Sequence, residues 1–154
     1  MLLLKNKKTK ARLVAIIFCV LFAGLFFVFN VNRGKKVCFG KDCFLVELAQ
    51  TQEELSQGLM FRESLAQNRG MLFIFATQGV YNFWMKNTKI PLDIIWINDK
   101  KEVVFIKNSA QPCEEYFCLP IEPGVEADFV LEVNAGLAEK IGLKTESKLI
   151  FRNF

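Results

Sequence analysis

An uninterrupted apolar segment near the N-terminus constrains this chain more than any other feature. Residues 13–29 (LVAIIFCVLFAGLFFVF) contain no charged side chain, and Asn30 and Val31 can extend the run. At about 1.5 Å per residue, a helix of this length spans roughly 26 Å, close to the thickness of a hydrocarbon core. The segment also has no polar face, which a helix packed on a globular core normally shows. We therefore predict a transmembrane anchor over residues 13–31.

A cleaved signal peptide is the main alternative, because it also combines a basic start with an apolar middle. Phe26, Phe27 and Phe29 are bulky at positions where a cleavage site needs small residues. A lipid-attachment site would place Cys directly after residues 23–24 (Ala-Gly), and Leu25 stands there instead. We interpret the segment as a retained anchor.

The charge distribution predicts the orientation of this anchor. Eight of the 20 basic residues and none of the 16 acidic ones precede Val37, and residues 1–12 hold five of these eight. Loops rich in Lys and Arg stay on the cytoplasmic side of a membrane. We expect a cytoplasmic N-terminus over residues 1–12, a single span in the cell membrane, a linker over residues 32–42 and an extracytoplasmic domain over residues 43–154.

The part of the chain after Lys36 is mildly acidic, with 12 basic and 16 acidic residues. Nucleic-acid binding requires a basic face, so we expect no nucleic-acid partner. The whole chain lacks His, which is the commonest metal ligand and the commonest general base. We therefore predict no cofactor and no metal.

Four cysteines after the apolar segment form two pairs with equal spacing, Cys38 with Cys43 and Cys113 with Cys118. An even number of cysteines in an exported domain indicates disulfides. Three connectivities are possible, and we favour the two local pairs because Gly40 suits a tight turn. A four-thiolate zinc site is the alternative, but an oxidising compartment favours disulfides.

The remaining sequence predicts a mainly β domain with short helices. Strands are expected over residues 43–49, 71–75, 81–86, 92–97, 102–106, 125–133 and 149–151. Residues 98–101 (NDKK) join two of these strands as a hairpin. Thr51 and Glu54 fit the capping box of a helix that Gly58 ends, and residues 137–141 fit a second short helix. We predict an all-β fold, a compact antiparallel β-sandwich or barrel-like domain.

The segment over residues 125–133 shows the clearest alternation. Glu126, Asp128 and Glu132 point to one side, with Val130 as the one apolar exception among them. A strand with period two normally has one face in the core and the other in water. We therefore expect these three carboxyl groups at the surface.

Several motifs in this domain resemble a known family. They are residues 58–62 (GLMFR), 70–73 (GMLF), 83–93 (FWMKNTKIPLD), 111–113 (QPC) and 130–132 (VLE). In this order they resemble the family catalogued as domain of unknown function 192, over roughly residues 43–151. The resemblance implies a compact β-sandwich with helical excursions, often exported behind a signal or an anchor. The family has no established activity, so the resemblance assigns no catalytic residue.

Polar and aromatic residues in and beside these motifs are the candidate ligand-binding residues. They are Arg62, Trp84, Lys86, Asn87, Thr88 and Asp93. The apolar residues around them usually form core, and the alternative is an apolar pocket with these groups at its rim. Met60, Met71 and Met85 have the thioether ligands that Cu(I) accepts, but in a chain without His we interpret them as core.

We interpret the protein as a membrane-anchored, non-enzymatic binding module of the cell envelope, whose partner is a small molecule, a glycan or an envelope protein. A solvent-open concave site that contains Trp84 would favour this function. A structural or assembly adaptor is the first alternative and requires an exposed apolar patch. The second is a hydrolase of an envelope glycan, in which Asp93 would converge with Glu63, Glu114 or Glu115.

Overall fold

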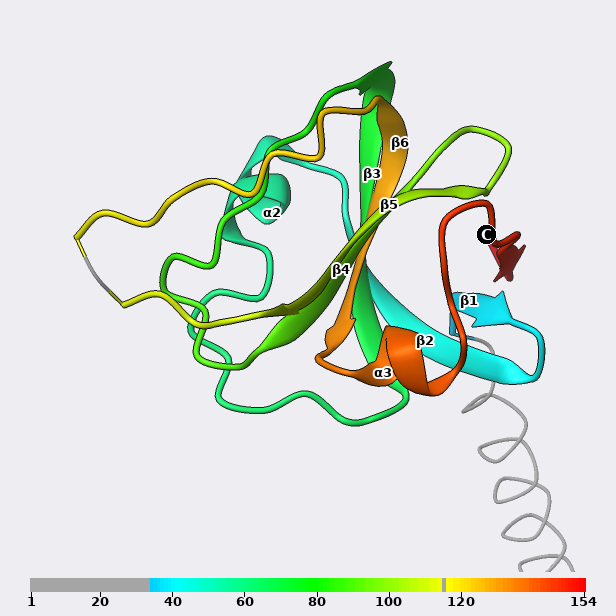
Figure 1. Cartoon of the computed structure of the whole chain (residues 1–154), viewed down its shortest axis with the longest axis horizontal. Helices are drawn as coiled ribbons and strands as arrows, with labels where there is room; N and C mark the ends of the chain where they lie inside the picture. Colours follow the sequence, from blue (N-terminus) through cyan, green and yellow to red (C-terminus); the bar gives the residue numbers. More distant parts are fainter. Residues whose placement is uncertain (1–33, 115) are drawn as a thin grey trace, which may run out of the picture. The chain divides into compact units, whose positions relative to one another are not determined.

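A curled sheet of seven strands organises the part of the chain that the computed structural model describes, residues 34–114 and 116–154 (Figure 1). The strands are β1 (Lys36–Phe39), β2 (Asp42–Ala49), β3 (Arg69–Gly79), β4 (Leu92–Ile97), β5 (Val103–Ala110), β6 (Ala127–Asn134) and β7 (Ile150–Arg152). The helices are α2 (Gln52–Gln57) and α3 (Leu137–Lys140). The strand order is β5-β4-β6-β3-β2-β1-β7.

The described residues contain no helix that is both long and apolar enough to cross a membrane. The cytoplasmic N-terminus predicted over residues 1–12 and the anchor predicted over residues 13–31 lie outside the described residues. Both therefore stay predictions.

The expectation of a mainly β domain with short helices is confirmed, and the single curled sheet is closer to the barrel-like alternative than to the sandwich; the expectation of wholly antiparallel pairing is wrong. The seven strands form one sheet, and β2 runs parallel to β3 while the other neighbours are antiparallel. Parallel neighbours need a long crossover, which residues 50–68 supply with α2. Sequence periodicity alone does not show strand direction, so this pairing was missed.

Most of the predicted strands are present with shifted ends, and β4 has the predicted limits. The segment over residues 81–86 is not a strand, because it makes only isolated bridges, from Phe83 to Ile121 and from Lys86 to Cys113. The sheet begins with β1, inside the stretch interpreted as a linker over residues 32–42.

The hairpin of β1 and β2 is closed by the first of the predicted local disulfides. Cys38 and Cys43 are directly opposite each other in the two strands and are bonded, and Gly40 takes a positive φ of 58° in the turn. Cys113 and Cys118 form the second local disulfide. The zinc alternative is therefore contradicted, because all four thiols that it requires are oxidised.

The helix α2 begins and ends as its sequence predicts. Thr51 Oγ1 accepts a hydrogen bond from the Glu54 N–H (3.2 Å), and the Glu54 carboxylate accepts one from the Thr51 N–H (3.0 Å). Gly58 ends the helix with a positive φ of 48°. This capping box fixes where the chain leaves β2 and enters the crossover.

Both faces of the central strands are buried, and each face carries its own apolar cluster. The first face holds Leu72, Ile95, Leu131 and Val133, packed against Val37, Leu137, Ala138 and Leu149. The second face holds Phe73, Ile94, Trp96 and Val130, packed against Leu59, Met85 and Ile90. The expectation that one face of residues 125–133 lies in water is therefore wrong for Glu132, which is buried on the second face.

Close contact between β3 and β6 depends on Gly70. A Cβ atom added at Gly70 would lie 2.6 Å from the backbone oxygen of Glu132, closer than real Cβ contacts allow. We expect Gly70→Ala to lower the free energy of unfolding by about 1–3 kcal/mol, because the two strands must separate. Urea denaturation of the full chain measures this loss. The exposed Gln78→Ala in the same strand is the control, and an equal effect of both changes would contradict the prediction.

Candidate functional site

The most unusual buried group on the second face is the carboxyl of Glu132, on β6. The residue is 5% exposed, and its cross-strand neighbours are the apolar Met71 on β3 and Ile94 on β4. Its Oε2 atom has no hydrogen-bond partner among the described residues. Native proteins rarely leave a buried carboxyl oxygen unpaired, since desolvation then costs free energy without compensation.

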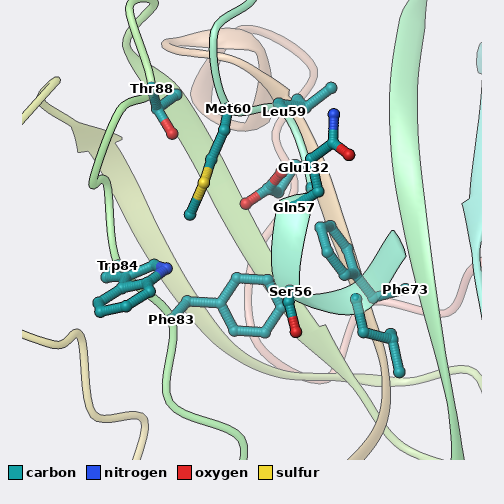
Figure 2. Close-up of a pocket in the computed structure, with 11 residues that line it drawn as sticks. Ser56, Gln57, Leu59, Met60, Phe73, Phe83, Trp84, Thr88 and Glu132 are labelled. Carbon is teal, nitrogen blue, oxygen red and sulfur yellow. The ribbon is translucent and has the colours of Figure 1, made fainter. Parts of the chain in front are cut away.

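A pocket borders this carboxyl (Figure 2). Its walls are the end of α2 and the following loop, β3, β6, and the segment after β3. The lining residues are Leu55, Ser56, Gln57, Gly58, Leu59, Met60, Phe73, Phe83, Trp84, Thr88 and Glu132. The space that the centre of a water molecule can reach is about 30 Å³. This is room for a few atoms rather than for a whole ligand.

Gly58 leaves the space beside the carboxyl open. Its backbone has φ 48° and ψ −133°, a conformation that side chains other than that of glycine rarely adopt. A Cβ atom there would lie 3.0 Å from Phe73 Cζ and 3.9 Å from Glu132 Oε2. The residue that ends α2 thus also lets the loop approach Phe73 and Glu132 closely.

Burial raises the pKa of Glu132 to about 8. The side chains that face it from α2, the loop, β3 and β4 are uncharged, so the described surroundings supply no ionic partner. At neutral pH the group is therefore mainly the protonated acid in the empty pocket. It holds a proton that a suitable ligand can receive as a hydrogen bond or displace.

A larger groove adjoins the pocket and leads to solvent. Its lining residues are Leu55, Ser56, Phe75, Tyr81, Asn82, Phe83 and Trp84, of which four also line the pocket. The space that the centre of a water molecule can reach in this groove is about 230 Å³. The Phe75 and Tyr81 rings are stacked, and Trp84 is 47% exposed. The groove and the pocket together form a concave, aromatic site that is open to solvent, and Glu132 lines its pocket side.

The backbone of the wall that carries Phe83 and Trp84 pairs with a neighbouring loop rather than with a strand of the sheet. Phe83 and Ile121 exchange backbone hydrogen bonds of 3.1 and 2.6 Å, and the Cys113 N–H donates to the Met85 carbonyl oxygen at 3.1 Å. The disulfide from Cys113 to Cys118 closes this loop. The second disulfide therefore lies next to the segment that forms one side of the site.

Two of the sequence-predicted site residues line the pocket, and a third contacts one of them. Trp84 lies on the wall shared by pocket and groove, and the buried Thr88 lies on the pocket side. Lys86 Nζ is 5.5 Å from the centroid of the Trp84 ring, within the range of a cation–π contact.

Arg62 and Asn87 have other partners and do not line the pocket. Arg62 Nη1 donates to Glu47 Oε1 at 2.8 Å in a bidentate pair, which lowers the pKa of Glu47 and raises that of Arg62. Asn87 has a φ of 56°, and its backbone oxygen accepts a hydrogen bond from the Phe61 N–H at 2.7 Å. Both residues fix the loops around the site.

Asp93 lies away from this pocket. It pairs with Val133 in the register of β4 and β6, while the next residue, Ile94, pairs with Glu132. Successive side chains of a strand point to opposite faces, so Asp93 is on the first face. Its two oxygens accept 2.8 Å hydrogen bonds from the backbone N–H groups of Ser109 and Ala138. The carboxyl therefore ties β5 and α3 to β4.

Sequence reasoning missed Glu132 as a site residue, because alternation assigned it to the solvent side. The available signal was Val130, the apolar exception on that side. An apolar residue among acidic ones indicates a covered surface, and the cover comes from residues far away in the sequence.

Comparison with known proteins places this chain in a family. The family model DUF192, described as "Uncharacterized ACR", matches residues 35–151. This chain belongs to the DUF192 family. The range includes every residue of the pocket and the groove. No curated protein matches the chain.

Two solved structures resemble this DUF192 protein. One is a protein of unknown function from Novosphingobium aromaticivorans DSM 12444, with 37% identity and a TM-score of 0.67, covering 75% of this chain and 82% of that chain. The other is described as a putative transcription regulator from Sinorhizobium meliloti 1021, with 30% identity and a TM-score of 0.70, covering 78% of this chain and 93% of that chain. The DUF192 fold is therefore shared with solved proteins.

The protonation of Glu132 predicts a pH-dependent stability. Its folded pKa of about 8 lies above the ordinary value of 4.5, so unfolding between these values releases a proton. This contribution to stability is complete below pH 4.5 and is lost as the pH rises to 8. We expect wild type to lose about 3–5 kcal/mol relative to Glu132→Gln between pH 4.5 and 8.5.

Urea denaturation of both proteins across this range measures the difference. Glu126→Gln, at an exposed position of the same segment, is the matched control and should follow the wild-type curve. Parallel curves for wild type and Glu132→Gln would show that Glu132 is ionised in the folded protein, contrary to the prediction.

We predict that replacing Asp93 lowers the stability of the fold, because its carboxyl has a structural role. Asp93→Ala leaves the buried N–H of Ala138 and the N–H of Ser109 without their acceptor, and we expect a loss of about 2–4 kcal/mol in the free energy of unfolding. Denaturation with urea measures it, and Asp99→Ala in the exposed turn before β5 is the control. A loss below about 0.5 kcal/mol, the range of ordinary surface changes, would contradict this role.

Proposed function

We propose that this DUF192 protein is a non-enzymatic binding module of the cell envelope that holds a small molecule in the groove and in the pocket that Glu132 lines. The observation that carries the proposal is a buried carboxyl whose Oε2 atom has no partner among the described residues, in the lining of an open aromatic site. A ligand with a complementary polar group would compensate the desolvation of this carboxyl, while its apolar part covers the aromatic walls.

Binding explains the site better than hydrolysis does. Carboxylate-dependent glycosidases need two carboxyl groups that flank one bond. Glu132 is the one carboxyl among the described residues that line the pocket and the groove. Asp93 is occupied by backbone amides on the other face, while Glu63 and Glu114 are exposed. Glu115 lies outside the described residues.

The proposed location is the outer side of the cell membrane, with residues 13–31 as a single span. The apolar run and the basic residues before it support this placement. The two disulfides also support it, because such bonds persist in oxidising compartments. We propose no role in nucleic-acid binding, since the chain after residue 36 has more acidic than basic residues.

An adaptor that binds an envelope protein is the second candidate. The loop closed by the second disulfide exposes Tyr116 fully and Phe117 to 73%, and Leu119 directly after it is 75% exposed. Exposed apolar side chains that lie close together are typical of interaction surfaces. The pocket still ranks first, because the loop does not explain why a buried carboxyl lacks a partner.

A fragment screen with the full chain tests the proposed function. We expect fragments with a polar head and an apolar body to shift the NMR signals of the Gly58 and Thr88 amides and the Trp84 indole. Ser56→Trp should abolish these shifts, because Ser56 lines both the pocket and the groove.

Glu53→Trp is the matched control for this variant, since Glu53 is exposed on the same helix but lines neither space. Shifts that survive Ser56→Trp in a folded protein, or a screen without any response at these three residues, would refute a small-molecule site here.

A further inference from the structure

We propose that the site selects molecules with a primary ammonium group on a short apolar body, with the ammonium on Glu132 and the body in the groove. The inference rests on the proposed function and adds the chemical class of the ligand. It follows from three features of the site. These are the charges of its lining residues, the size of the pocket, and the absence of ionisable groups around the Glu132 carboxyl among the described residues.

The charge complement of the pocket favours a cation. Its described lining residues contain a carboxyl and the rings of Phe73, Phe83 and Trp84, and they contain no Lys or Arg. The faces of aromatic rings carry partial negative charge and attract ammonium groups. An anionic ligand would find no basic partner at Glu132, and its charge would disfavour ionisation of that carboxyl.

The aromatic side chains are arranged as walls of a small cage. Phe73 and Phe83 meet edge to face, with ring centroids 4.9 Å apart and an interplanar angle of 83°. Figure 2 shows Glu132 between Gln57 and Met60, with the rings of Phe73, Phe83 and Trp84 around the same space. Outside the lining residues, Lys86 Nζ lies 5.5 Å from the centroid of the Trp84 ring, so this ring already makes one cation–π contact.

The inner space selects a small head group. The pocket that Glu132 lines has about 30 Å³ open to the centre of a water molecule, which suits a small head group such as a primary ammonium. The adjoining groove is larger, at about 230 Å³, and is lined mainly by apolar and aromatic side chains. A ligand with an ammonium group in the pocket and an aliphatic chain of a few carbons in the groove fits this arrangement.

An ammonium ligand would change the ionisation of Glu132. None of the residues that line the pocket with Glu132 or pair with it across the sheet is ionisable. They are Leu55, Ser56 and Gln57 from α2, Leu59 and Met60 from the loop, Met71 and Phe73 from β3, Ile94 from β4, and Phe83, Trp84 and Thr88 from the outer segment. An ammonium ion within hydrogen-bond distance favours the carboxylate, so binding below pH 8 releases a proton from Glu132.

The test uses three four-carbon probes, n-butylamine, n-butanol and butyrate, titrated into the full chain between pH 6.5 and 9. The signals of the Gly58 and Thr88 amides and the Trp84 indole report binding. We expect butylamine to bind at least tenfold more tightly than butanol or butyrate at pH 8. Its apparent Kd should fall by up to tenfold per pH unit as the pH rises toward 8, and should level off above it.

Two variants separate the roles of the charged residues. Glu132→Gln should weaken butylamine binding at least tenfold and remove its dependence on pH. Lys86→Gln should leave the affinity unchanged or strengthen it, because Lys86 repels a second cation near Trp84. The wild-type preference for amine and its pH dependence test the inference even if Glu132→Gln fails to fold.

The outcomes distinguish this inference from the proposed function. Equal binding of butanol and butylamine, tighter binding of butyrate, weaker binding after Lys86→Gln, or an affinity that does not change with pH would overturn the ammonium assignment. A small-molecule site would survive each of these results. If neither the three probes nor the fragments shift the three reporter signals, the ammonium assignment and the proposed function both fail.

Discussion

Burial of the sheet on both faces is the constraint on which the rest of this structure depends. The central strands β4 and β6 contribute side chains to an apolar cluster on each face. Any polar side chain in these strands must therefore find a partner inside the protein or remain unpaired. Two of the carboxyl groups in these strands, Asp93 and Glu132, are buried and have opposite outcomes.

Asp93 and Glu132 lie on neighbouring strands, in adjacent positions of the register but on opposite faces. The oxygens of Asp93 accept hydrogen bonds from two backbone amides, so the residue fixes β5 and α3. Glu132 Oε2 has no partner among the described residues, and Glu132 lines a solvent-open pocket that adjoins a larger groove. A carboxyl that is satisfied by the fold stabilises it, whereas an unsatisfied one beside an open pocket is available to a ligand.

The site is built from segments that are individually simple and far apart in the sequence. The capping box at Thr51 sets the start of α2, and Gly58 ends it where a side chain would meet Phe73. The outer wall is an irregular segment held by the loop that the second disulfide closes. Because the pocket is lined from both β3 and β6, it depends on the pairing of these two strands.

The sequence by itself determined the features that depend on neighbouring residues. These are the strands with clear periodicity, the capping box of α2, the hairpin between β4 and β5, and the two local disulfides. Two residues of the motif that the sequence singled out, Trp84 and Thr88, line the pocket. Each of these features follows from interactions within a few residues, which a pattern can express.

The tertiary structure alone decided the parallel pairing of β2 with β3, the second covered face of β6 and the environment of Glu132. Alternation shows that a side chain is on one side of a strand, but not what lies over that side. The cover of Glu132 comes from Leu59, Met85 and other residues that are 40 to 80 positions away, and the burial of a carboxyl depends on that cover rather than on its neighbours in the chain.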